Sequence, residues 1–145
     1  QDRGFEVSVI HKAGAIGQAS DYWGNTYFDP VAFVDGEPTK LAGFCTDIWF
    51  SKAIEFIEKN KKQKFFVFIP TNTAHEPLTP KSEDLELYSD TSSLSPSQKK
   101  FYALITNIDT NVGKLNQALK DHDVYENTIV IFMTDNGSGV RAYNA

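Results

Sequence analysis

One candidate site is a pair of oxygen-bearing side chains at the end of an apolar run. Asp135 and Asn136 directly follow residues 128–133. They offer a carboxylate and an amide carbonyl, which are the hard oxygen donors that Ca²⁺ and Mg²⁺ prefer. Two ligands are too few for Ca²⁺, so others must come from elsewhere. The same pair, followed by Gly137, also forms a favourable turn sequence, so a metal site and a plain turn both stay open.

A second candidate is His75, which lies in the polar segment 71–77 after the apolar run 65–69. An imidazole can donate a hydrogen bond to an anionic substrate or protonate a leaving group. The alternative is a histidine that only hydrogen-bonds within its own loop. His11 and His122 are weaker candidates, because the first has no identifiable partner and the second ends a predicted helix, where its charged form suits the dipole.

The single cysteine, Cys45, is a candidate nucleophile by residue type alone. It enters a predicted helix, and a helix N-terminus lowers a thiol pKa. No histidine lies near it in the sequence, however, and a lone cysteine often behaves as a small buried apolar residue. We therefore expect Cys45 to be buried and inert.

Hydrophobic periodicity predicts the helices that would position these residues. One helix is expected near 46–60, with Thr46 or Asp47 as its N-cap. Another is expected near 96–121, where a Ser-x-x-Gln capping box and a proline mark the first turn. An apolar stripe runs along this second helix. It consists of Phe101, Ile105, Ile108, Val112, Leu115 and Leu119.

Two unbroken apolar runs predict the sheet. Residues 65–69 and 128–133 are rich in β-formers, which favours strands buried on both faces. The order helix, strand, helix, strand predicts an α/β fold with a mainly parallel sheet flanked by helices. Right-handed crossovers would bring His75 and Asp135 to the same edge of that sheet. Residues 1–44 are expected to form loops and short strands.

Composition excludes several classes of protein. The chain has 145 residues and a net charge of −5. This charge argues against a nucleic-acid binder, which needs a basic face to meet phosphates. No apolar run approaches the ~20 residues required to cross a membrane. No signal peptide precedes Gln1, and we expect the chain to be truncated at both ends.

Several motifs, taken in order, resemble those of bacterial arylsulfatase-like proteins. The matches span about residues 4–139, nearly the whole chain. They are GAIGQ at 14–18 with DYWGN at 21–25, GFCTD at 43–47, NTAHEP at 72–77, NID at 107–109 with NVG at 111–113, and ENT through TDNG at 126–137. The chain thus resembles an internal piece of a sulfatase, a family of the alkaline phosphatase superfamily.

The resemblance implies an alkaline-phosphatase-like α/β fold, with residues 1–145 forming part of a single catalytic domain. It implies hydrolysis of a sulfate ester at a Ca²⁺ site, with Asp135 and Asn136 as two metal ligands and His75 in contact with the sulfate group. In the family, a Cys or Ser of a Cys/Ser-x-Pro-x-Arg motif is oxidised to formylglycine, whose hydrate attacks sulfur. The metal withdraws charge from the sulfate oxygens.

The chain departs from the family pattern in several places. No Cys/Ser-x-Pro-x-Arg motif occurs in it, and the residues after Cys45 do not match one. The family's paired aspartates and its further Lys and His residues are also unmatched. We therefore expect the nucleophile and the other metal ligands to lie outside this segment, and the segment alone to be inactive. Ala74 stands where the family commonly has Pro, and residues 11–13 replace a more Gly-rich run.

Two other functions stay open on the sequence. One is a phosphatase or phosphodiesterase of the same superfamily, which would need two close metal ions. The other is a non-catalytic domain that keeps the fold and binds a ligand. The resemblance implies a sulfated small molecule or glycan as substrate and a periplasmic or secreted location, but neither the particular substrate nor the oligomeric state.

Overall fold

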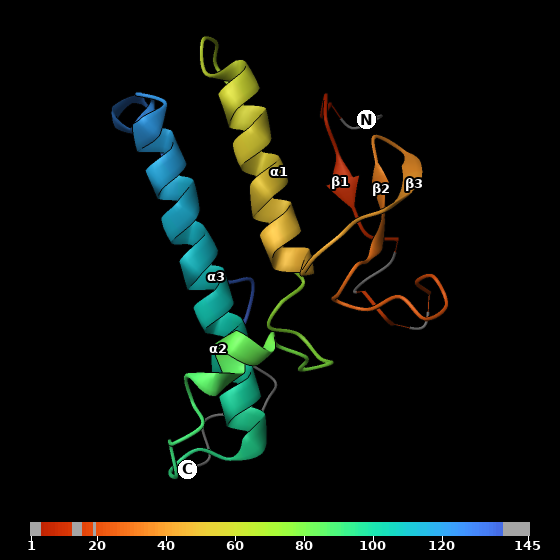
Figure 1. Ribbon diagram of the computed structural model, residues 1–145. Coiled ribbons are helices and arrows are strands. Elements are labelled where there is room, and N and C mark those ends of the chain that lie inside the picture. Colours follow the sequence, from red (N-terminus) through yellow and green to blue (C-terminus); the bar gives the residue numbers. More distant parts are fainter. Residues whose placement is uncertain (1–3, 13–15, 19, 138–145) are drawn as a thin grey trace.

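The computed structural model describes residues 4–12, 16–18 and 20–137 (Figure 1). Two long helices lie side by side, and a small sheet lies on the other side of the first (Figure 1). The elements in chain order are β1 (Val9–Ile10), β2 (Val31–Val34), β3 (Glu37–Lys40), α1 (Cys45–Asn60), α2 (Ser82–Glu86), α3 (Pro96–Asp121) and the 3-10 turn η1 (Tyr125–Asn127). Within the described ranges, no helix is both long and apolar enough to span a lipid bilayer.

The sheet is antiparallel, with strand order β1-β2-β3. Asp35 and Gly36 connect β2 to β3 with φ angles of 52° and 93°. A two-residue hairpin turn needs this left-handed pair, and Asp-Gly is a sequence that supplies it. Asp35 also ties β1 to the hairpin, because its Oδ1 accepts the backbone N–H of Ser8 at 2.8 Å. The N-terminal region thus contains short strands and loops, as predicted.

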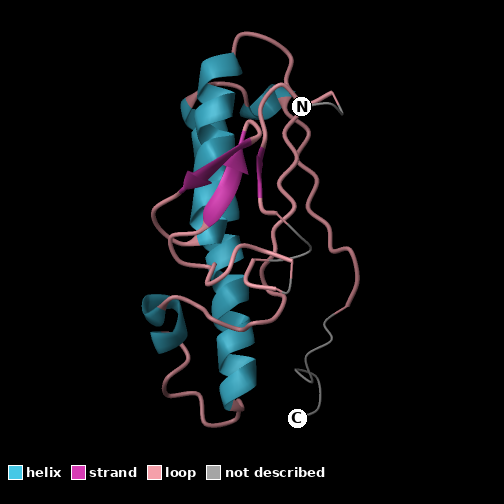
Figure 2. Ribbon diagram, turned by 90° about the vertical axis from the view of Figure 1, so that its right-hand side faces the viewer, coloured by secondary structure: helices cyan, strands magenta, loops and turns pink. Residues whose placement is uncertain are grey.

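The predicted parallel sheet is not present among the described residues. The runs 65–69 and 128–133 have no strand pairing and are drawn as loops in Figure 2. Phe66 and Phe68 are 72% and 66% exposed, and all residues from Ile129 to Met133 are exposed. The prediction of two central strands, buried on both faces, is therefore wrong for this structure. A strand needs a hydrogen-bonded neighbour, and no described segment pairs with either run.

Both predicted helices are confirmed. Ser95 and Gln98 form the expected capping box at the start of α3, with hydrogen bonds of 2.8 and 3.3 Å. The start of α1 differs from the prediction, because Phe44 is its N-cap and provides no side-chain cap. Thr46 and Asp47 instead reach side chains on other segments.

The buried face of α3 is more polar than its apolar stripe predicted. Of that stripe only Leu119 is fully buried, and Ile105 is 42% exposed. Leu104, Asn107 and Asn111 are almost completely buried instead. Buried amides need hydrogen-bond partners, and α1 supplies one for both asparagines.

The main hydrophobic core joins the N-terminal region, the start of α1 and the first half of α3. Its buried members are Ile16, Tyr27, Ala32, Phe44, Cys45, Ile48, Trp49 and Leu104. Burying one large apolar side chain of this kind contributes about 1.5–3 kcal/mol. Ile69, Ala74 and Leu78 pack against the core, so the loop that carries His75 rests on it.

Candidate active-site loop

Residues 71–77, which we call the His75 loop, are held by the buried start of α1. The side-chain oxygens of Thr46 and Thr73 lie 2.8 Å apart. The indole N–H of Trp49 donates to Oδ1 of Asn72 at 3.0 Å. All four side chains are buried, and buried polar groups that are paired in this way hold a loop in one conformation.

Contacts from the N-terminal region place His75 itself. Its carbonyl accepts the hydroxyl of Tyr27 at 2.9 Å. Burial raises the pKa of Tyr27 to about 12, so the phenol keeps the proton that it donates. The ring Nδ1 lies 2.9 Å from the carbonyl oxygen of Glu76 and 3.3 Å from Nε2 of Gln18. The ring is exposed, and none of the described residues hydrogen-bonds to its Nε2. The exposed ring is thus open to a substrate.

Gln18 reaches His75 from a turn built around the Asp21 carboxylate. This carboxylate accepts three hydrogen bonds of 2.7 to 2.9 Å. The donors are the backbone N–H groups of Gly17 and Tyr22 and the side chain of Asn25. Asn25 is bound in turn to both the N–H and the carbonyl of Val31 in β2. The turn is therefore fixed to the sheet.

The sequence reasoning missed both residues that hold His75 from the N-terminal side. Gln18 and Tyr27 lie 57 and 48 positions away from His75 along the chain. Neither residue type is reactive by itself, and no local pattern connects such distant positions. The one available signal concerned Gln18, which lies in the 14–18 motif that resembles the family, whereas Tyr27 lies outside the quoted motifs.

Cys45 is completely buried, as expected. Burial raises the pKa of its thiol to about 11. Nδ2 of Asn72 donates to its sulfur at 3.6 Å. A neutral, buried thiol is a poor nucleophile, so the structure supports a packing role for Cys45.

Asp135 and Asn136 lie in an exposed turn. The backbone N–H of Asn136 donates to Oδ1 of Asp135 at 2.8 Å, a local bond typical of turns. Among the described residues, no hydrogen bond or ion pair connects this turn to His75, and no group of three or more acidic, His or Cys side chains is placed to hold a metal. The two oxygen donors suit Ca²⁺ but make only part of a coordination shell. That they meet His75 at one site stays a prediction.

A cluster of charged and amide side chains connects the three helices to the segment that follows the His75 loop. Oδ1 of Asp47 accepts the side-chain amides of Asn107 and Asn111 at 3.0 and 2.6 Å, and its Oδ2 accepts Nζ of Lys81 at 3.0 Å. Burial raises the pKa of Asp47, but these hydrogen bonds outweigh it, so the pKa lies below its ordinary value. Burial raises the pKa of Asp84, which lies 3.7 Å from Lys81. The cluster fixes the chain just after the His75 loop.

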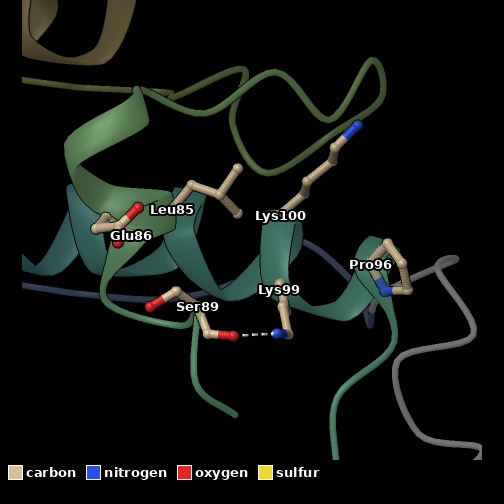
Figure 3. A pocket seen from close by; sticks show the side chains of 6 residues that line it. All are labelled: Leu85, Glu86, Ser89, Pro96, Lys99 and Lys100. Carbon is tan, nitrogen blue, oxygen red and sulfur yellow. Dashed lines mark hydrogen bonds between the residues drawn. The ribbon is translucent and has the colours of Figure 1, made fainter. Parts of the chain in front are cut away.

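A separate hollow of about 300 Å³ lies between α2 and the start of α3 (Figure 3). It is lined by Leu85, Glu86, Ser89, Pro96, Lys99 and Lys100. Nζ of Lys99 donates to the carbonyl of Ser89 at 2.7 Å, whereas Lys100 extends away from this group (Figure 3). Neither His75 nor Asp135 lines this hollow, so it is distinct from the candidate site.

Comparison with known protein sequences places the chain among sulfatases. A family model described as Sulfatase matches residues 1–145. The uncharacterized sulfatase YdeN of Escherichia coli K12 is 26% identical over 141 residues, covering 95% of this chain and 23% of that protein. Human N-acetylgalactosamine-6-sulfatase is 29% identical over 97 residues, covering 66% and 17%. The chain thus spans about a fifth of the length of these relatives.

Comparison with solved structures bears on the fold. The crystal structure of Ps i-CgsB superposes with a TM-score of 0.74 at 24% identity, covering 86% of this chain and 31% of that one. The same protein in complex with k-i-k-neocarrahexaose gives the same values. The fold of most of this chain therefore also occurs within a larger protein. Because the family model covers every residue, this chain belongs to the sulfatase family.

Proposed function

We propose that the gene product carrying this chain hydrolyses sulfate esters, with His75 in contact with the sulfate group or the leaving oxygen. The main support for the proposal is the way in which the His75 loop is held. Its base is fixed by buried hydrogen bonds at Thr46 and Trp49, while the imidazole stays exposed. A reactive side chain on a rigid support, with its ring exposed, is suited to donate a proton or a hydrogen bond to an anion. Family membership supplies the reaction class.

The metal and the nucleophile belong to the same proposal. Asp135 and Asn136 would provide two oxygen ligands for Ca²⁺, which when bound would withdraw charge from the sulfate oxygens. A formylglycine would be the nucleophile, formed in a Cys/Ser-x-Pro-x-Arg motif that these 145 residues do not contain. Cys45 is unsuited to that role, because it is buried and its sequence context differs.

We further propose a sulfated glycan as the substrate class and a periplasmic or secreted location. One relative is named for an N-acetylgalactosamine sulfate, and the similar structure Ps i-CgsB has been solved with a bound oligosaccharide. The turn that carries Gln18 also presents Trp23, which is fully exposed at 104%. An exposed aromatic ring offers an apolar face on which a sugar can stack. The location rests on the family resemblance alone.

Matched substrates test the reaction class. The gene product would be assayed with an aryl sulfate and with the phosphate of the same aryl group. We expect sulfate hydrolysis, reduced roughly 10²–10⁴-fold in His75→Ala. His122→Ala is the control, since His122 contacts Lys61 at the far end of α3, and it should retain activity. Because His75 is exposed, its substitution should not change thermal stability.

Preferential hydrolysis of the phosphate would contradict a sulfatase and favour the phosphatase alternative. Activity of His75→Ala equal to that of His122→Ala would remove His75 from the site.

A further inference from the structure

We propose that Gln18 is a positioning residue that selects the tautomer of His75, an inference that rests on the proposed function of that histidine. Nε2 of Gln18 lies 3.3 Å from Nδ1 of His75 and 3.5 Å from the carbonyl oxygen of Glu76. The same Nδ1 lies 2.9 Å from the same carbonyl oxygen. An amide nitrogen, a ring nitrogen and a carbonyl oxygen thus meet at one point.

One neutral imidazole cannot satisfy all three contacts. The carbonyl of Glu76 only accepts, so a bond from Nδ1 requires the ring proton on Nδ1. The amide nitrogen of Gln18 only donates, so a bond to Nδ1 requires a lone pair there. A neutral ring carries one N–H, so Gln18 favours the proton on Nε2 and Glu76 favours it on Nδ1. The two neighbours therefore stabilise opposite tautomers.

Only the tautomer that Gln18 stabilises suits a neutral His75 facing an anionic substrate. Nε2 is the ring nitrogen to which no described residue hydrogen-bonds. With a proton it donates to a sulfate oxygen, whereas with a lone pair it repels one. The Gln18 amide also lies near enough to the Glu76 carbonyl to replace the donor that the carbonyl loses. The Gln18 amide can thus donate one hydrogen bond to Nδ1 of His75 and another to the Glu76 carbonyl, which would otherwise compete for a proton on Nδ1.

The backbone of Gln18 is held independently of its side chain, so the proposed role can be tested without disturbing the fold. The carbonyl of Gln18 accepts the backbone N–H of Asp21 at 2.9 Å, and the turn around Asp21 is fixed to β2 through Asn25. The Gln18 side chain itself is exposed. Removing its amide should therefore leave the backbone of the turn in place and change mainly the hydrogen bonding of His75.

Ring ¹⁵N chemical shifts test the proposal directly, because they distinguish the two neutral tautomers and the cation. Histidine would be ¹⁵N-labelled in the complete gene product, and the His75 signals would be assigned by their loss in His75→Asn. We expect the proton on Nε2 in the wild type at neutral pH. Gln18→Leu, which loses the donor, and Gln18→Glu, whose carboxylate accepts, should both place a proton on Nδ1. Gln117→Leu is the control, because that amide donates to Asp121 within α3, far along the chain from His75.

The effect on catalysis completes the test. Loss of one oriented hydrogen bond should lower kcat/KM for a sulfate ester roughly tenfold in Gln18→Leu, and Gln117→Leu should match the wild type. Unchanged ring shifts in both Gln18 variants would overturn the proposal, as would altered shifts with unchanged kcat/KM. The ring measurement does not depend on turnover. A wild type without sulfatase activity but with the expected shifts would therefore count against the proposed function and not against the tautomer selection.

Discussion

Thr46 and Thr73 share a hydrogen bond of 2.8 Å between two buried hydroxyl groups. Thr46 lies in the first turn of α1, and Thr73 lies two residues before His75. The bond therefore connects the buried start of α1 to the loop that carries the proposed active-site histidine.

Removing one of these hydroxyls should weaken both stability and catalysis. Thr73→Val keeps the side-chain shape but leaves the Thr46 hydroxyl with only the long 4.0 Å contact to the Cys45 sulfur among the described residues, which should cost about 1–3 kcal/mol of unfolding free energy in denaturant titrations. The kcat/KM should fall as well, because a small shift of the loop misplaces His75. Thr39→Val is the control, since the Thr39 hydroxyl donates to the carbonyl of Glu37, two residues away. The double variant Thr46→Val/Thr73→Val should cost less than the sum of the single changes, and full additivity would argue against the bond.

Breaking the Asp47 cluster should destabilise the helix pair. Asp47→Ala leaves Lys81, Asn107 and Asn111 without the carboxylate that they share, and we expect a loss of about 3 kcal/mol in unfolding free energy. Glu55→Ala, which removes the exposed ion pair with Lys52, should cost less than 1 kcal/mol, roughly the usual limit for surface pairs. Equal effects of the two substitutions would show that the cluster is no stronger than a surface pair.

The same cluster should make the unfolding free energy depend on pH. The folded-state pKa of Asp47 is below its ordinary value of 3.8, because the hydrogen bonds from Asn111, Asn107 and Lys81 outweigh burial. Its stabilisation is therefore present above pH 3.8 and is lost as the pH falls through the lower folded-state value. Measured below pH 3.8, the unfolding free energy of the wild type should fall more steeply than that of Asp47→Ala. Parallel curves would mean that Asp47 gains nothing from its partners.

Cys45 should resist labelling and should make the fold sensitive to alkali. Burial raises the pKa of the thiol from 9.0 to about 11, so thiol reagents should react slowly under native conditions and rapidly after unfolding. Above pH 9.0 the unfolded thiol ionises while the folded thiol keeps its proton. Unfolding free energy should therefore decrease between pH 9.0 and about 11, by about 1.4 kcal/mol per pH unit from this group. Cys45→Ala should remove that part of the slope, and rapid native labelling would contradict the burial.

Asp135→Ala should lower both Ca²⁺ affinity and sulfatase turnover in the complete gene product, because a carboxylate ligand is lost. Calorimetric titration with Ca²⁺ measures the first effect without requiring turnover. Asp109→Ala, at an exposed position on α3, is the control. Unchanged Ca²⁺ affinity in Asp135→Ala would mean that residues 135–137 form a plain turn and not part of a metal site.

The 145-residue chain by itself should not hydrolyse sulfate esters. The proposed route needs a nucleophile and a filled metal shell at the same time, whereas this chain contributes only Asp135, Asn136 and His75 to the proposed site. Turnover by the purified chain, compared with its His75→Ala variant to exclude a contaminating enzyme, would overturn this account of where the nucleophile lies.

The sequence by itself determined the elements whose causes are local. The capping box of α3 involves residues three positions apart, and the helix periodicity repeats every three to four residues, so both helices were predicted with nearly correct ends. The family motifs are likewise contiguous strings, and they identified the sulfatase family before any geometry was available. The candidate residues His75, Asp135 and Asn136 came from the same strings.

Only the tertiary structure decided which surfaces meet. The pairing of Gln18 with His75 spans 57 positions, and no local sequence pattern connects the two residues. Asn107 and Asn111 are buried because Asp47 approaches them from another helix, which an apolar stripe could not predict. The runs 65–69 and 128–133 show that a local sequence preference alone does not make a strand. Their residues favour strands, but strand pairing depends on a neighbouring segment, and none of the described residues provides one. Helices close their hydrogen bonds within a few residues, whereas sheets and buried polar pairs need partners that only the folded chain brings together.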